Sequence, residues 1–156
     1  KFINDQLYDN CPLINLTTNN SVFPHIPGYI HYTILEILKN SIVSHQNNNI
    51  IDKPINITIG EGKNDIIIKI SDNGLGFPFK DIDKVLTYSY STSPIDITEE
   101  YELTNRPIIC GFGFGLPMSR LHCRYFGGDL HINPIEGIGT DVSIYINKLG
   151  NKDEQL

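Results

Sequence analysis

The sequence predicts an α+β domain, a two-layer α/β sandwich in which helices cover one face of a mixed, mainly antiparallel sheet. Three observations predict it: an apolar stripe at helical spacing, two pairs of short alternating segments, and a glycine-rich loop that opens a second helix. The 156 residues suffice for one domain with a substantial core, and 40% apolar with 19% charged residues is ordinary for a globular protein.

The N-terminal part supplies a short strand and a long helix. Residues 12–17 alternate well enough for a strand, within an Asn-rich stretch that prolines interrupt as far as Pro27. From Gly28 onward, apolar residues recur at helical spacing and form a stripe that we expect to face the core: Ile30, Ile34, Leu35, Leu38 and Ile42. Three consecutive asparagines at 47–49 then end the helix.

An antiparallel hairpin follows the first helix. Residues 54–59 alternate isoleucine with polar residues, a turn with two glycines comes next, and residues 66–70 are nearly all β-branched. A short helix is expected from Lys80 to Thr87. Its inward-facing residues would be Ile82, Val85 and Leu86.

The C-terminal part supplies the second helix and a second hairpin. A stretch without periodicity, residues 88–110, is expected to form a mobile lid over a functional site. A helix is then predicted from Leu116 to Phe126, and two glycines end it. Residues 129–133 and 140–147 form the last hairpin. One domain therefore occupies residues 1–156, with a core over about 24–148.

Bulk properties exclude several classes of function. The formal net charge of −6 argues against a nucleic-acid partner, which needs a basic surface. No apolar run approaches a membrane span, and no signal peptide is visible. Three cysteines without metal-ligand spacing argue against zinc and fit a reducing compartment. Motifs for a nucleophilic serine or cysteine and the P-loop motif are absent from the sequence.

A glycine-rich loop precedes the second helix, and its glycines alternate with aromatic residues. Glycine lets the backbone approach a ligand closely, and the first turn of a helix attracts anions. The loop is therefore predicted to grip phosphate, with a plain hinge as the alternative. Its residues are Gly111, Phe112, Gly113, Phe114, Gly115 and Leu116.

Two further groups of residues are candidates for chemistry. Glu36 and Asn40 lie four residues apart on one helix face, where an amide oxygen can bind Mg²⁺ and a carboxylate can accept a proton. The alternative is a solvent-exposed polar face, extended by Lys39. Asp72 ends a strand, and its carboxylate could accept from an exocyclic amine while Thr140 supplies a hydroxyl to the same pocket. The alternative there is an ordinary Asx turn.

The order of these signals resembles the ATP-binding domain shared by gyrase, Hsp90, histidine kinases and MutL, the Bergerat-type fold. Four segments resemble the mitochondrial protein kinases more closely, namely the pyruvate dehydrogenase kinases and the branched-chain α-ketoacid dehydrogenase kinase. These segments are LEILKNS at 35–41, ISDNGLGFP at 70–78, IDKVLTYSYSTSP at 82–94, and the run from GFGFGLP to VSIYI at 111–146. The resemblance covers roughly residues 24–148.

The resemblance implies an Mg–ATP-binding catalytic domain of a protein serine kinase that phosphorylates, and so inactivates, an α-ketoacid dehydrogenase. By resemblance, Asn40 would bind Mg²⁺ and Glu36 would be the general base. Asp72, supported by Thr140, would accept from the adenine amino group. The remaining nucleotide contacts would come from the lid and from glycine-rich segments, namely Gly74, Gly76, Ser91, Thr92 and the loop Gly111–Leu116.

The resemblance also implies partners and a compartment. The E1 subunit of the ketoacid dehydrogenase would be the protein substrate and its lipoyl-bearing core the scaffold, in the mitochondrial matrix. A homodimer through the sheet is expected. The family's N-terminal helical-bundle domain is absent from this chain, so we expect the chain alone to bind nucleotide but to phosphorylate poorly.

The sequence also departs from the family. Tyr32 replaces a histidine common one turn before the glutamate, Leu75 replaces a glycine, and residues 41–44 lack the usual arginine. Two alternative functions therefore remain. One is the catalytic domain of a sensor histidine kinase, which the lid segment at 88–94 disfavours. The other is a nucleotide-gated interaction module without phosphoryl transfer, which the missing arginine leaves open.

Overall fold

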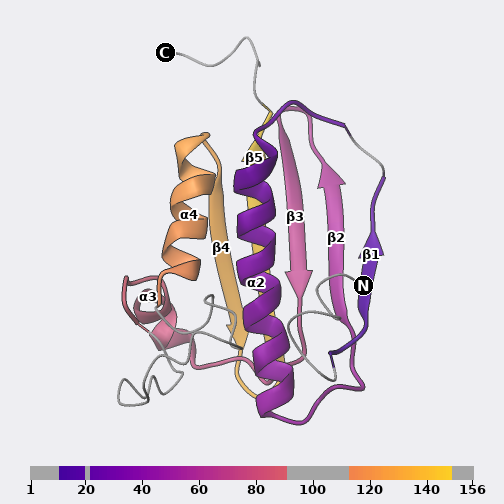
Figure 1. Cartoon of the computed structure of the whole chain (residues 1–156), viewed down its shortest axis with the longest axis vertical. Helices are drawn as coiled ribbons and strands as arrows, with labels where there is room; N and C mark the ends of the chain where they lie inside the picture. The colour runs from indigo at the N-terminus through magenta and orange to yellow at the C-terminus, as the bar shows by residue number, and fades with distance from the viewer. Residues whose placement is uncertain (1–10, 20–21, 91–112, 149–156) are drawn as a thin grey trace, which may run out of the picture.

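The computed structural model describes residues 11–19, 22–90 and 113–148. Five strands form one sheet in the order β1-β2-β3-β5-β4. Helices α2 and α4 lie side by side over one face of this sheet (Figure 1). The predicted two-layer sandwich is therefore confirmed.

The sheet is mixed but mainly antiparallel. β2 (Ile55–Glu61) and β3 (Asp65–Ser71) form the first predicted hairpin, and β4 (Asp129–Ile135) and β5 (Gly139–Asn147) form the second. β5 also pairs antiparallel with β3, which joins the two hairpins at the centre of the sheet. The short β1 (Ile14–Thr17) pairs in parallel with β2 and forms one edge.

Helix α2 (Pro27–Asn47) begins with the proline that the first turn of a helix tolerates. Leu38 and Ile42 of the predicted stripe are buried, but Ile37, which the stripe omitted, is equally buried. The buried face is wider than predicted because polar residues share it. These are Thr33, Glu36, Ser41 and His45.

The core lies between the helices and the sheet. Alternate residues of β3 and β5 point towards the helices, because successive side chains of a strand face opposite sides. This layer consists almost wholly of isoleucine, with the buried residues Ile66, Ile68, Ile70, Val142, Ile144 and Ile146.

The helix predicted from Lys80 to Thr87 is shorter than expected. It consists of a 3₁₀ turn, η1 (Phe79–Asp81), and one helical turn, α3 (Ile82–Val85). The inward residues are only partly buried, although Leu86 packs against the core. A positive φ of 66° at Ser89 turns the chain shortly after this point, so the helix cannot continue.

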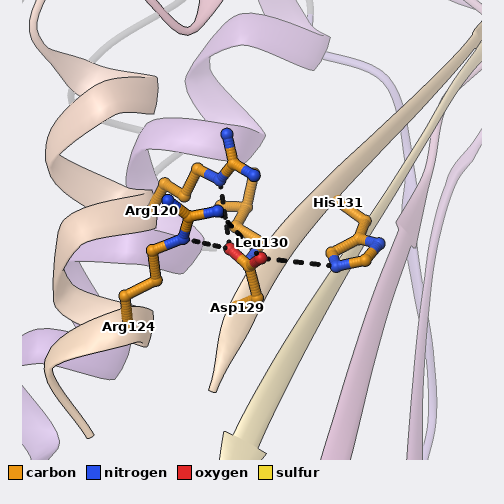
Figure 2. A network of polar contacts seen from close by, with 5 residues as sticks. All are labelled: Arg120, Arg124, Asp129, Leu130 and His131. Carbon is orange, nitrogen blue, oxygen red and sulfur yellow. Dashed lines mark hydrogen bonds and ion pairs between the residues drawn. The ribbon is translucent and has the colours of Figure 1, made fainter. Parts of the chain in front are cut away.

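Helix α4 (Gly115–Tyr125) begins one residue before the predicted start and is fixed at its C-terminal half by Asp129 (Figure 2). Arg120 Nε and Arg124 Nε donate to Asp129 Oδ1 over 3.1 and 3.0 Å, and the Leu130 N–H donates over 2.8 Å. Partial burial alone would raise the pKa of Asp129, but these hydrogen bonds outweigh it and hold the pKa well below its usual range. The carboxylate therefore anchors α4 to the start of β4.

Candidate functional site

Asp72 lies at the end of β3 and its carboxylate accepts three hydrogen bonds. Oδ1 accepts from the backbone N–H groups of Gly74 and Thr140 over 2.9 and 3.2 Å. Oδ2 accepts from Ser41 Oγ over 2.9 Å. The two oxygens of a carboxylate offer about four acceptor positions. Within residues 11–19, 22–90 and 113–148, one position on Oδ2 therefore remains for a donor from a ligand.

Thr140 lies beside Asp72, as the sequence predicts. The connection runs through the main chain, because the Asp72 N–H also donates to the Thr140 carbonyl oxygen over 3.0 Å. One main-chain hydrogen bond and one bond from the Thr140 N–H to the Asp72 carboxylate thus join the end of β3 to the start of β5. The aspartate is held by the sheet itself.

A polar stripe on the C-terminal half of α2 binds the loop that follows Asp72. Ser44 Oγ and Asn48 Nδ2 donate to the Gly74 carbonyl oxygen over 2.6 and 3.1 Å. His45 Nε2 accepts from the Asn73 N–H over 3.0 Å. With Ser41, these residues recur at helical spacing (41, 44, 45, 48), and Asn48 follows the last residue of α2 directly. This spacing of polar residues is the sequence signal that could have found them.

The glycines near Asp72 let the chain pack closely against itself. A Cβ on Gly74 would collide with the Ser44 side chain, and one on Gly76, where φ is +58°, would lie 2.5 Å from the Gly139 carbonyl oxygen. Gly137 N–H donates to the Leu75 carbonyl oxygen over 2.8 Å, so the β4–β5 turn touches the same loop. Room for a nucleotide at Gly74 and Gly76 stays a prediction.

Glu36 is buried rather than solvent-exposed, so the exposed-face alternative is wrong for this residue. Its side chain keeps 10% of its exposure, and Lys39 Nζ donates to its two oxygens over 2.7 and 2.8 Å. Burial, and after it the negative charge of Glu36, raises the pKa of Tyr32 one turn earlier. A Cβ on Gly115 would collide with Glu36 Oε2, so the first residue of α4 packs directly against the carboxylate.

Asn40 lies one turn beyond Glu36 and is exposed. Within the described ranges its side chain takes part in no hydrogen bond, in contrast to the other polar residues of this helix face. Its amide oxygen is therefore available to a ligand from solvent.

Part of the glycine-rich loop and the start of the predicted lid lie together. The Ser89 N–H donates to the Gly113 carbonyl oxygen over 3.2 Å, and the Phe114 and Tyr88 rings lie 6.1 Å apart. Gly113 has a φ of +67°, and a Cβ there would lie 2.5 Å from the Tyr90 carbonyl oxygen. Leu116 packs against the core at the start of α4. The predicted contacts Ser91, Thr92, Gly111 and Phe112 lie outside the described residues.

A pocket with mostly apolar walls lies elsewhere, between the first turns of α2, the end of α4 and the end of β5. It is lined by Tyr29, Thr33, His122 and Cys123, among others. Burial lowers the pKa of His122 and raises that of Cys123 to about 11. No predicted site residue lines this pocket, so the candidate site is the region around Asp72, Asn40 and Glu36.

Comparison with known proteins decides the family. The model of a family described as histidine kinase-, DNA gyrase B-, and HSP90-like ATPases matches residues 26–149. The chain belongs to this ATPase family. No helix among the described residues is both long and apolar enough to span a membrane.

Curated relatives of this ATPase domain are mitochondrial kinases of pyruvate dehydrogenase. The chain is 39% identical to the human pyruvate dehydrogenase (acetyl-transferring) kinase isozyme 4 over 95% of its own length and 38% of the relative. It is 37% identical to the Arabidopsis thaliana pyruvate dehydrogenase kinase over 96% of its own length and 43% of that protein. The Drosophila melanogaster kinase is 36% identical over 100% of this chain and 40% of the relative. The chain therefore spans about two fifths of the relatives it matches.

The exposed oxygen donor of Asn40 in this ATPase domain fits a magnesium ion shared with nucleotide phosphates. The described residues contain no group of three or more His, Cys, Asp or Glu side chains able to hold a metal. Mg²⁺ prefers oxygen ligands, keeps several waters and commonly shares its coordination between one or two protein groups and substrate phosphates. The exposed amide oxygen of Asn40 fits this mode of binding.

Proposed function

We propose that this chain is the Mg–ATP-binding catalytic domain of a protein serine kinase that phosphorylates, and so inactivates, an α-ketoacid dehydrogenase. The observation that carries the proposal is the Asp72 carboxylate, which three fixed donors orient and which keeps one acceptor position free. Such a group selects a ligand with an amine donor, as adenine presents. The kinase relatives support the choice of reaction.

Each residue of the site then has a distinct role. Asp72 Oδ2 would accept from the adenine amine, and Asn40 would bind the metal. Bound Mg²⁺ supplies positive charge that neutralises the phosphates during transfer. Glu36, held in place by its pair with Lys39, would orient the substrate serine hydroxyl and accept its proton.

Lys39 links the proposed base to the phosphates. Its ammonium group donates to the two Glu36 oxygens and so holds the carboxylate in place. Phosphate oxygens placed near Asn40 would compete for the same ammonium group. Bound nucleotide would then free the Glu36 oxygens to contact the substrate hydroxyl.

The proposal is tested by calorimetry of Mg–ADP with the 156-residue chain. Wild type is expected to bind, and Asn40→Ala is expected to remove the dependence of affinity on magnesium. Asn47→Ala, an exposed asparagine at the end of the same helix, is the matched control and should keep that dependence. No binding by the folded wild type would contradict the proposal.

The protein substrate requires the full-length protein. The names of the relatives favour the E1 subunit of pyruvate dehydrogenase over the branched-chain enzyme, with the lipoyl-bearing core as scaffold and the mitochondrial matrix as compartment. Phosphate transfer from labelled ATP to each purified E1, with loss of its activity, measures the preference. Phosphorylation of a histidine instead would support the sensor-kinase alternative, and binding without transfer the interaction module.

The oligomeric state is a separate part of the proposal. Helices α2 and α4 cover one face of the sheet (Figure 1), and we propose a homodimer through the opposite face. Lys69 and Ser143 point to it, so a charge there tests the contact. Analytical ultracentrifugation should give a dimer for wild type and a monomer for Ser143→Asp, and an unchanged dimer would contradict this interface.

A further inference from the structure

A buried histidine joins helix α2 to the loop that carries Asp72. We propose that His45 is a positioning residue for base recognition, which acts as the neutral tautomer protonated on Nδ1 and holds the Asp72–Asn73 peptide in place. This inference rests on the proposed function and adds to it a residue that no family motif in the sequence indicated.

The hydrogen bonds of His45 define its tautomer. Nε2 lies 3.0 Å from the Asn73 backbone nitrogen, which can only donate, so Nε2 must be the acceptor. Nδ1 lies 2.9 Å from the Ile50 carbonyl oxygen, which can only accept, so Nδ1 must carry the proton. The side chain is 0% exposed. Both ring nitrogens therefore have protein partners. The Asn73 N–H requires an acceptor at Nε2, and the Ile50 carbonyl oxygen requires a donor at Nδ1.

The peptide between Asp72 and Asn73 is confined on both of its sides. Its N–H donates to His45, and its carbonyl oxygen lies so close to Gly139 that a Cβ there would collide with it. Because a peptide unit is planar, fixing both sides fixes the orientation of the plane. The Asp72 side chain is attached to the Cα atom at the start of this peptide plane. Its direction towards a ligand therefore depends on the bond to His45.

The neighbouring side chains hold different parts of the loop. Ser44 and Asn48 bind the Gly74 carbonyl oxygen, two residues beyond Asp72, and Ser41 binds the carboxylate itself. Loss of the His45 acceptor would therefore leave the loop attached to α2. The Asp72–Asn73 peptide would lose the restraint on its N–H side, and one buried N–H would lose its partner.

Two conservative substitutions separate the two ring nitrogens. His45→Gln places an amide oxygen near the position of Nε2 and can still accept from the Asn73 N–H. His45→Asn reaches only the position of Nδ1 and keeps only the donor to Ile50. Filling the core also favours Gln, which is closer to His in volume than Asn is, so amide exchange at Gly74 and Thr140 separates positioning of the peptide from core filling.

The first measurement is Mg–ADP affinity of the 156-residue chain by calorimetry. We expect His45→Gln to bind within about threefold of wild type and His45→Asn to bind about tenfold or more weakly. Equal losses in both variants, or wild-type affinity in His45→Asn, would overturn the proposal. Unfolding of His45→Asn leaves the decision to His45→Gln, whose loss of affinity by tenfold in a folded chain would also overturn it.

Two spectroscopic measurements do not require nucleotide. Ring ¹⁵N chemical shifts should place the His45 proton on Nδ1, and a proton on Nε2 would overturn the proposal. The amides of Gly74 and Thr140, which both donate to Asp72, should exchange hydrogen faster in His45→Asn than in His45→Gln, while the β3 and β5 amides stay unchanged. Unchanged exchange at both amides would contradict the positioning role.

These measurements also separate the two proposals. Absence of Mg–ADP binding by wild type contradicts the proposed function alone. Amide exchange at Gly74 and Thr140 then still decides whether His45 positions Asp72.

Discussion

Two polar regions on helix α2 differ in how far the described residues satisfy them. Around Asp72, three donors from the sheet, the loop and the helix hold one carboxylate. Around Glu36, a buried carboxylate has one lysine as its partner, and the neighbouring Asn40 is exposed. We infer that the fold itself builds the base-binding end, whereas the phosphate-binding end is completed by the charges of its ligand.

Asp72→Asn should have the largest effect on the base-binding end. Asparagine keeps one acceptor oxygen for the backbone amides but presents an NH₂ group where the ligand amine must donate. The ligand would lose a charge-assisted hydrogen bond, and its amine would face a second donor. Mg–ADP binding should therefore weaken by about a hundredfold. Calorimetry measures this, with Asp52→Asn in an exposed loop as the control. Affinity within threefold of wild type would remove Asp72 from the site.

Lys39→Met tests the phosphate-binding end. It leaves the Glu36 carboxylate buried without this partner, and should lower the free energy of unfolding by about 2–3 kcal/mol, between the values for exposed and fully buried pairs. Chemical denaturation measures the change. Lys84→Met, which breaks a more exposed pair with Asp81, should lower the free energy of unfolding much less. Equal changes in the two variants would show that the buried Glu36–Lys39 pair stabilises the fold no more than the exposed Lys84–Asp81 pair.

Ser41→Ala should have a smaller effect at the base-binding end. It removes one of three hydrogen bonds to Asp72 while both backbone amides remain, so Mg–ADP affinity should fall by about fivefold. Thr17→Ala, at an exposed position of the edge strand β1, is the control. A loss as large as that of Asp72→Asn would show that the backbone amides do not orient the carboxylate.

Asp129, which anchors α4, lies outside both regions. Asp129→Asn should therefore have the smallest effect. Its pKa is lower in the folded chain than in the unfolded one, so it stabilises the fold above the unfolded value near pH 4 and loses this contribution as pH falls further. Both arginines are partly exposed, so the contribution should be about 1 kcal/mol at neutral pH. Denaturation of wild type and Asp129→Asn at pH 7 and pH 3 measures it. A difference that does not shrink at pH 3 would contradict this origin.

Periodicity in the sequence predicted most of the fold. The long helix, the second helix and both hairpins follow from spacing of 3.6 or 2 residues, and the structure has all four. Ile37 was missed because polar residues lie beside it on the buried face of α2. The apolar stripe in the sequence is therefore narrower than the face that is buried. The parallel pairing of β1 with β2 could not be predicted, since local sequence contains no information on which distant strand is the partner.

The site was predicted unevenly for a physical reason. Asp72, Thr140, Glu36 and Asn40 stand in motifs, and the structure places Thr140 beside Asp72. The polar stripe on α2 was missed because a polar helix face usually contacts solvent, whereas this one contacts a loop about 30 residues later in the chain. Only the tertiary fold turns such residues into site residues.

Helix α2 fixes the distance between the two regions. Nine residues separate Glu36 from His45, which corresponds to about 14 Å along the axis of a regular helix. One inserted residue between them would turn one set of side chains by about 100° relative to the other. Under the proposed function, the nucleotide would have to match this helix in length as well as in chemistry, because the helix fixes the distance between the two regions.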